Sequence, residues 1–197
     1  MGYIFYLMGK SSSGKDTLYK KIRERMPELK TITGYTTRPV RDNEENGREY
    51  YFVDNEKMNE MIKQGIVIEN RAYHTMFGVW NYFTADDGQI RHTRDSYILI
   101  GTLESFMKVR DYYGKDKVIP IYIEVEDGLR LKRALEREMR QKNPKYAELC
   151  RRFLADEEDF KESNIVKCKI DRRFYNIDME QCVNEICQFI KDKKDCV

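Results

Sequence analysis

Residues 9–17 read Gly-Lys-Ser-Ser-Ser-Gly-Lys-Asp-Thr, and this stretch decides the fold. It matches the phosphate-binding pattern G-x-x-x-x-G-K. A short apolar run at 3–8 precedes it, and residues 17–26 follow with apolar side chains at helical spacing. A strand, a glycine loop and a helix in that order are the context that the motif requires. We therefore predict a nucleoside triphosphate site, with a serine-rich turn that matches by chance as the alternative.

The predicted loop combines backbone donors with one full positive charge. Its glycines let N–H groups converge on phosphate oxygens at the positive end of a helix, and Lys15 adds an ammonium group near the β- and γ-phosphates. The residues expected to bind ATP phosphates are Gly9, Ser11, Ser12, Ser13, Gly14, Lys15, Asp16 and Thr17.

Asp16 departs from the usual motif, which has Ser or Thr at this position to offer a hydroxyl to Mg²⁺. Because Mg²⁺ favours hard oxygen ligands, the Asp16 carboxylate could hold the ion, directly or through water. Alternatively, Thr17 supplies the hydroxyl. Either way, Mg²⁺ is the expected cofactor, with ATP as phosphoryl donor.

The rest of the chain alternates between strand and helix patterns. Apolar runs at 96–101 and 118–125 are typical of buried strands, and each is followed by a segment of helical period. Such alternation favours a parallel sheet covered by helices, although Pro120 cannot donate a ladder hydrogen bond. Near the C-terminus one apolar helical stripe is predicted to dock on the core, and its cysteines are expected to act as small core residues: Met179, Cys182, Val183, Ile186, Cys187 and Ile190.

Composition excludes several classes of protein. The chain has 197 residues, of which 41% are hydrophobic and 36% charged, and this charge content argues against a membrane protein. The net charge of +2 is too balanced for general nucleic-acid binding. The five cysteines form no Cys-x-x-Cys pair, so we expect neither a zinc site nor a disulfide framework. The first eight residues lack a basic segment, which predicts a cytoplasmic location.

Residues 34–53 read Gly-Tyr-Thr-Thr-Arg-Pro-Val-Arg-Asp-Asn-Glu-Glu-Asn-Gly-Arg-Glu-Tyr-Tyr-Phe-Val. Here the chain resembles the guanylate kinase family, whose acceptor lobe has the pattern T-T-R-x-x-R-x-x-E-x-x-G-x-x-Y-x-F-V. The resemblance covers most of the chain, with the phosphate loop before this segment and an Ile-Glu-x-x-x-Tyr stretch at 68–73 after it. It is most specific in the acceptor lobe.

The resemblance implies a binding site for a nucleoside monophosphate. Arg38, Arg41 and Tyr50 would grip its phosphate, and Glu69 would accept hydrogen bonds from guanine N1 and the 2-amino group. The chemistry agrees, since guanidinium forks suit phosphate oxygens. A carboxylate that faces the two donors of guanine would also match adenine poorly. The residues expected to bind GMP are Arg38, Arg41, Glu44, Tyr50 and Glu69.

Residues 127–140 are predicted to form a helix that carries a row of arginines on one face: Arg130, Arg133, Arg137 and Arg140. Glu126 is placed to pair with Arg130 four residues later, whereas Arg137 has no acidic residue three or four positions away. We therefore expect Arg137 to face an external anion, with a solvated basic face as the alternative. The resemblance assigns Arg133, Arg137 and a following arginine, Arg152, to the transferring phosphoryl group. The expected catalytic residues are Lys15, Arg41, Arg137 and Arg152.

A few positions differ from the family pattern. Gly34 replaces a serine expected at guanine O6, Phe77 replaces a tyrosine expected at the phosphate, and Val79 stands where Ser or Thr is usual. The segment that ends at Thr102 lacks the aspartates that the family has after this strand. These differences predict weak or altered specificity for the acceptor.

The resemblance implies an α/β fold of the phosphate-loop type: three α/β/α layers with a parallel central sheet, a small mixed acceptor lobe and a helical lid. The chain would form a single domain with a core (1–33, 94–129 and 161–197), a monophosphate-binding lobe (34–93) and a lid (130–160). The implied function is ATP-dependent phosphorylation of GMP and dGMP, by a monomer or homodimer that binds neither nucleic acid nor membranes.

Two alternative functions remain open. The Gly-Lys-Asp ending of the loop and the Ile100-Gly101-Thr102 turn are similar to those of ribose 1,5-bisphosphate phosphokinase, a related small kinase. The other alternative is a non-catalytic guanylate-kinase-like module that binds partner proteins. The intact Gly9, Gly14 and Lys15 argue against such a module, and the complete acceptor motif argues for a nucleotide rather than a sugar phosphate.

Overall fold

A computed structural model describes residues 2–41, 44–75, 78–90 and 94–195. The strands are β1 (Ile4–Gly9), β2 (Lys30–Thr31), β3 (Tyr35–Thr36), β4 (Tyr51–Phe52), β5 (Val67–Thr75), β6 (Gly78–Ala85), β7 (Tyr97–Gly101), β8 (Val118–Glu124) and β9 (Arg173–Tyr175). The helices are α1 (Lys15–Arg25), α2 (Asn55–Lys63), α3 (Leu103–Tyr113), α4 (Asp127–Met139), α5 (Tyr146–Asp159), α6 (Glu162–Lys167) and α7 (Met179–Asp195).

The central sheet is parallel, with strand order β2-β7-β1-β8-β9. All six residues of β1 are buried, as expected for a strand that is covered on both faces. The order reverses at β1, whose neighbours β7 and β8 come later in the chain. In sheets of this kind ligands bind beyond the carboxyl ends of the strands at such a point. The phosphate loop follows β1 directly and therefore lies there.

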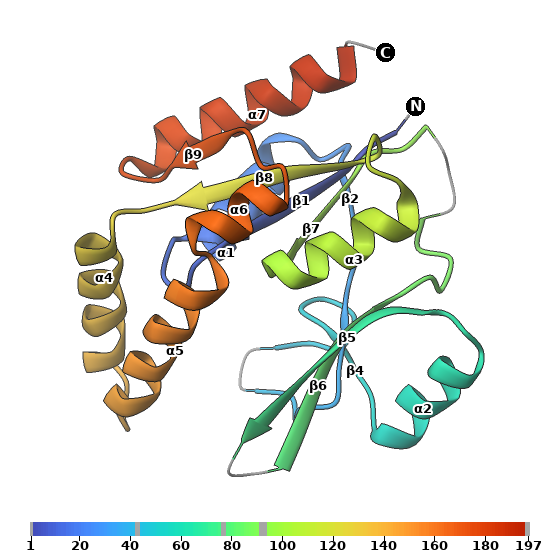
Figure 1. The fold of residues 1–197 in the computed structure, drawn as a ribbon, viewed down its shortest axis with the longest axis horizontal. Helices are drawn as coiled ribbons and strands as arrows, with labels where there is room; N and C mark the ends of the chain where they lie inside the picture. The colour runs from blue at the N-terminus through green and yellow to red at the C-terminus, as the bar shows by residue number, and fades with distance from the viewer. Residues whose placement is uncertain (1, 42–43, 76–77, 91–93, 196–197) are drawn as a thin grey trace.

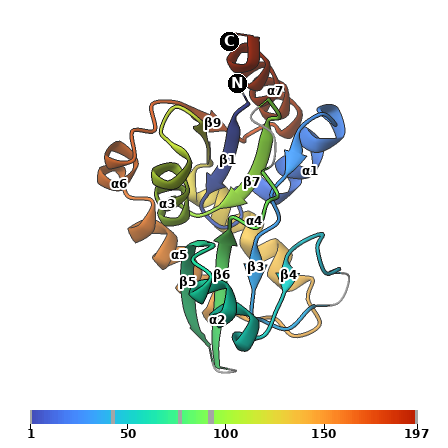
Figure 2. The same ribbon diagram turned by 90° about the vertical axis from the view of Figure 1, so that its right-hand side faces the viewer.

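Helices cover both faces of this sheet (Figures 1 and 2), which confirms the predicted three layers. On one face, Leu18 and Ile22 of α1 pack with the buried side of α7. On the other face, Phe106 of α3 and Ile165 of α6 join a second cluster. The predicted C-terminal stripe is confirmed, since its two cysteines and their aliphatic neighbours are buried in the first cluster: Cys182, Val183, Ile186, Cys187 and Ile190.

Pro120 fits within β8 because of where the neighbouring strand begins. It lies opposite Tyr6 of β1, but β9 pairs with β8 only from Tyr122 onward. At Pro120 the strand therefore has only one hydrogen-bonded neighbour, and an edge position tolerates a missing N–H group.

A second, four-stranded sheet has the order β4-β3-β6-β5 and contains both parallel and antiparallel pairs. Helix α2 packs on it through Met58 and Met61, which contact a cluster with Phe83 and Ala85. The Asp54 side chain begins this helix by accepting a hydrogen bond from the Lys57 amide. This small mixed lobe lies below the carboxyl ends of the central strands in Figure 2, and α4 and α5 lie together at the left in Figure 1.

Candidate active site

The phosphate loop bends sharply between β1 and α1. Ser12 and Gly14 both have a positive φ, of 63° and 83°. A side chain at position 14 would also collide with Asn176, whose amide nitrogen would lie 2.4 Å from the added Cβ. The same Asn176 amide donates a hydrogen bond to the Ser13 carbonyl at 2.8 Å. The loop is therefore braced by the segment between β9 and α7, and glycine is needed at position 14.

Polar groups in this loop are left without partners. The hydroxyl oxygens of Ser12 and Ser13 are buried and form no hydrogen bond within the described residues. Gly14 gives α1 no side-chain cap, so the first amides of this helix have no side-chain acceptor at that position. Unpartnered donors at a helix N-terminus form a site for an anion such as a phosphate group.

Lys15 is half-buried at the first position of α1, whereas Asp16 and Thr17 are exposed. Burial lowers the pKa of Lys15, and the guanidinium groups of Arg152 and Arg137 lower it further, while Asp16 and Asp156 oppose this change. The pKa of Lys15 therefore responds to cations as well as to carboxylates. A bound polyanion would restore the charge balance of this cluster.

The three predicted lid arginines differ in their contacts. Arg133 donates to the Asn176 carbonyl at 3.1 Å, and its second terminal nitrogen is buried without a partner in the described structure. Arg152, on α5, donates to the Ser11 hydroxyl at 3.1 Å and so reaches the phosphate loop directly. Arg137 is exposed and forms no ion pair with any described residue.

Arg130 does not belong to the solvent-facing arginine row, and its predicted pairing with Glu126 is wrong. Only 1% of the Arg130 side chain is exposed, and it donates to Asp127, Asp156 and Glu157 at 3.0, 3.2 and 2.5 Å. Glu126 instead caps α4 by accepting from two backbone amides at its start. Arg130 therefore fastens α5 to α4, because two of its three acidic partners come from α5.

The phosphate loop is tied into the same network. The Asp156 carboxylate accepts from the Ser11 amide at 2.8 Å, and Lys10 contacts Glu157 at 2.7 Å. Sequence reasoning missed these two carboxylates, since they lie more than 140 residues from the loop. No local spacing connects such distant segments.

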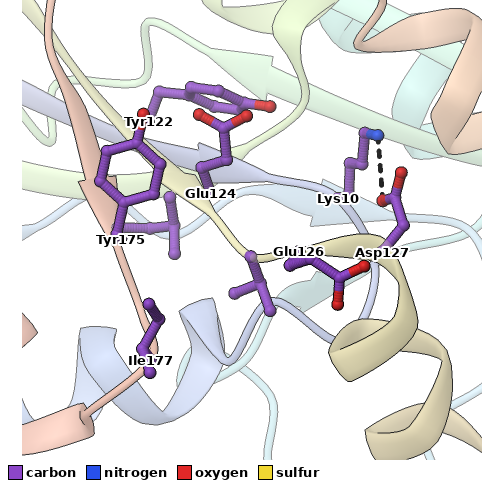
Figure 3. Close-up of a pocket in the computed structure, with 9 residues that line it drawn as sticks. Lys10, Tyr122, Glu124, Glu126, Asp127, Tyr175 and Ile177 are labelled. Atoms are coloured by element: carbon purple, nitrogen blue, oxygen red, sulfur yellow. Dashed lines mark hydrogen bonds and ion pairs between the residues drawn. The ribbon is translucent and has the colours of Figure 1, made fainter.

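Figure 3 shows a cavity of about 380 Å³ beside Lys10, whose ammonium group reaches Asp127. Glu124 and Glu126 also line this cavity, together with Tyr175 and other side chains at the ends of β8 and β9. The residues that line the cavity include three carboxylates and one ammonium group, so its lining is acidic and does not suit a phosphate.

In the second lobe, Arg38 is buried and held on several sides. Its guanidinium group donates two hydrogen bonds to the Glu44 carboxylate, both at 2.7 Å. It also lies over the rings of Tyr50 and Phe52, at 5.4 and 5.2 Å from their centres. Arg38 holds the pKa of Glu44 below its ordinary value through these hydrogen bonds. Glu44 therefore orients Arg38, and the Nε atom of Arg38 is left without a partner in the described residues.

Arg41 and Tyr50 complete the predicted phosphate grip. Arg41 is exposed, and its backbone amide donates to Glu44 at 3.0 Å. Burial raises the pKa of Tyr50, and the phosphate-loop carboxylate of Asp16 contributes to the rise.

Glu69 lies in β5, and most of its acceptor positions are taken by other residues. Its carboxylate accepts from Arg71 at 3.0 and 3.4 Å and from the Thr84 hydroxyl at 2.8 Å. Arg71 also donates to the Thr102 hydroxyl at 3.2 Å and so connects the lobe to the central sheet. Sequence reasoning missed Arg71, although residues 69 and 71 are two apart in a strand and therefore share a face.

The positions that differ from the family pattern are partly visible. Gly34 has room for a side chain, since an added Cβ would meet its first neighbour at 3.5 Å. Val79 is exposed at the start of β6, and Phe77 lies outside the described residues. Thr102 caps α3 and contacts Arg71, so this threonine stands at the site where an aspartate was expected.

Comparison with known proteins places these features in one family. The family model described as Guanylate kinase matches residues 3–191. A guanylate kinase from Rhodopseudomonas palustris is 44% identical over 68 residues, which cover 34% of this chain and 31% of that protein. A guanylate kinase from Thermotoga maritima is 27% identical over 155 residues, which cover 78% of this chain and 63% of that protein.

A solved structure shows the same fold. The crystal structure of guanylate kinase from Anaplasma phagocytophilum superposes with a TM-score of 0.66 at 23% identity, over 98% of this chain and 86% of that one. No helix among the described residues is both long and apolar enough to cross a membrane. The match of the family model over almost the whole chain, together with the phosphate loop and acceptor lobe described above, shows that this chain belongs to the guanylate kinase family.

Proposed function

We propose that this protein transfers the γ-phosphoryl group of ATP to GMP and dGMP. The observation that carries the proposal is the phosphate loop, where Lys15 has no ion-pair partner among the described residues and Arg152 donates to the Ser11 hydroxyl at 3.1 Å. Two cations therefore lie at a loop that presents unpartnered serine hydroxyls. Family membership supports the same reaction, since the similar proteins named above are guanylate kinases.

The acceptor phosphate would bind between Arg41, Tyr50 and Arg38. Glu44 and two aromatic rings hold Arg38 in place, so its orientation is set before a ligand arrives. Arg41 is exposed and free to turn toward an oxyanion. Pre-organised guanidinium groups suit phosphate because they bind two oxygens with little loss of side-chain entropy.

The transfer needs no general base, because the phosphate of a nucleoside monophosphate already presents an ionised oxygen. The task of the protein is to align two polyanions and to stabilise charge on the equatorial oxygens of the transferring group. Lys15, Arg137 and Arg152 would stabilise the donor side, and Arg41 would hold the acceptor in line. A sugar hydroxyl would require a carboxylate base. The segment that ends at Thr102 lacks the aspartates that could serve as this base, which disfavours a sugar acceptor.

The residues after Lys15 fit a magnesium ion. Asp16 and Thr17 are both exposed and directly follow Lys15 in α1. A carboxylate and a hydroxyl are hard oxygen donors of the kind that Mg²⁺ prefers. When bound, Mg²⁺ would neutralise part of the phosphate charge.

The test is ADP release from Mg·ATP with GMP, dGMP, AMP, CMP, UMP or ribose 1,5-bisphosphate offered separately. We expect the rate of ADP release with GMP or dGMP to exceed the rate with the other nucleotides by a factor on the order of 10² or more. Phosphorylation of the sugar phosphate alone, or of none of the offered acceptors, would refute the proposal. In the latter case, lack of an ATP-induced rise in the thermal midpoint would favour a binding module, because a ligand of the folded state must stabilise it.

A further inference from the structure

Arg71 and Glu69 form a pair at the place where the base of the acceptor is expected. Both lie on one face of β5, and Arg71 bridges from Glu69 to Thr102, the residue that begins α3. The following inference rests on the proposed function, since it concerns how the same site reads guanine.

The Glu69 carboxylate is buried and largely occupied by contacts within the protein. Its side chain is 0% exposed, whereas that of Arg71 is 16% exposed. A carboxylate has about four acceptor positions. Three of those of Glu69 are used, two by Arg71 and one by Thr84. A base that enters this site therefore meets Arg71 first, with Glu69 behind it.

Arg71 has donors to spare. Three of its five N–H groups are engaged, by Glu69 through Nε and Nη2 and by Thr102 through Nη1. One N–H group on each terminal nitrogen is unused by the described residues. Arg71 lies opposite Tyr82 of β6, so the two side chains share a face of the sheet, and the Tyr82 ring lies 5.5 Å from the ring of Tyr50. Arg71 is therefore on the face of the lobe that carries Tyr50.

We propose that Arg71 reads guanine through its O6 and N7 atoms, and that Glu69 and Thr102 are positioning residues that hold the Arg71 fork. Two adjacent acceptors at O6 and N7 are what a guanidinium fork matches best on this base. The proposal also explains how the site works without the serine expected at position 34, because Arg71 supplies the donor for O6. Adenine would be rejected because its 6-amino group is a donor and would meet the N–H groups of Arg71.

This arrangement makes a different prediction from direct reading by Glu69. If Glu69 accepted from N1 and the 2-amino group, a nucleotide without that amino group would bind poorly. If Arg71 reads O6 and N7, the 2-amino group has little effect and N7 becomes essential. IMP lacks the 2-amino group but keeps O6 and N7, whereas 7-deaza-GMP keeps the 2-amino group and lacks N7.

The first experiment compares kcat/KM for GMP, IMP and 7-deaza-GMP with the unaltered protein. We expect IMP to be within about threefold of GMP, and 7-deaza-GMP to be reduced by about 5- to 150-fold, the range for loss of a bidentate contact. The reverse ranking, with IMP reduced and 7-deaza-GMP equal to GMP, would overturn the inference while leaving the proposed function intact. Absence of GMP phosphorylation would overturn both.

The second experiment uses two variants and a control. Arg71→Lys keeps the positive charge but loses the guanidinium fork. In this variant kcat/KM for GMP should fall to the value for 7-deaza-GMP, and kcat/KM for 7-deaza-GMP should itself change little. Glu69→Gln should raise KM for GMP and for IMP by the same factor, so that the ratio of their kcat/KM values stays near one. Arg48→Lys alters an exposed arginine of the same lobe and should leave the ranking unchanged. A Glu69→Gln variant that lost discrimination between GMP and IMP, after the native protein had shown it, would contradict the proposal.

Discussion

Arg130 offers a direct test of what holds the lid to the phosphate loop. Its guanidinium group is buried, lies 4.0 Å from the centre of the Phe153 ring and donates to three carboxylates. Replacing Arg130 by methionine keeps most of the packing against Phe153 but removes the charge. Asp156 would then be the worst affected, because its side chain is only 14% exposed.

The expected loss follows from the burial of the partners. Removing one member of a fully buried ion pair costs about 3–5 kcal/mol, because the remaining charge stays uncompensated. Here Asp127 and Glu157 are 46% and 38% exposed and can be hydrated, so only Asp156 contributes the larger penalty. We therefore expect Arg130→Met to lower the free energy of unfolding by about 2–3 kcal/mol. For a chain of this size the thermal midpoint would fall by roughly 4–12 °C.

The assay is urea unfolding followed by circular dichroism, with thermal unfolding as a second readout. Arg151→Met is the matched control, because Arg151 lies on the neighbouring helix α5 and pairs with Glu148, but both side chains are at least half exposed. The control should cost less than about 1 kcal/mol. A loss for Arg130→Met no larger than that of the control would refute the reasoning.

Three further predictions concern charges of the site. Lys15→Met should abolish the ATP-induced rise in the thermal midpoint while leaving the unliganded protein as stable as before or more so, because burial of the native ammonium is unfavourable; a fall in its midpoint without ATP would contradict this. Arg137→Met should lower kcat on the order of 10³-fold with unchanged unfolding, whereas Arg140→Met on the same helix should keep its activity. Arg38 lowers the folded-state pKa of Glu44, so the ionised carboxylate stabilises the fold at pH values above its unfolded pKa of about 4.3. This stabilisation is lost as the pH falls through the lower folded-state pKa. Unfolding free energies measured from pH 6 to pH 3 should therefore fall less steeply for Glu44→Gln than for the native protein.

Local patterns predicted the elements that carry the fold. The apolar run before Gly9 became β1, and the stripe at 179–190 became the buried side of α7. These predictions succeeded because strand and helix periodicity reflect which side of an element is buried. The family resemblance then gave the correct layers and the second lobe, which periodicity alone does not arrange in space.

The side-chain partners of the site could not be predicted in the same way. Spacing placed Arg130 in a row of exposed arginines, because spacing along the sequence gives the helix face of a residue but not its partners on other helices. Its partners Asp156 and Glu157 come from another helix, and no rule of local spacing joins them. Arg71 is different, because its period-two relation to Glu69 was present in the sequence and predicts that the two side chains share one face.

The contact between Asn176 and the Ser13 carbonyl has a consequence for the order in which the protein matures. It joins residues 163 positions apart, and the asparagine lies between β9 and α7. During synthesis the phosphate loop emerges first, and its brace follows 163 residues later. A nascent chain can therefore form β1 and α1 before the phosphate loop is braced. The loop should take its fixed shape only after Asn176 has emerged.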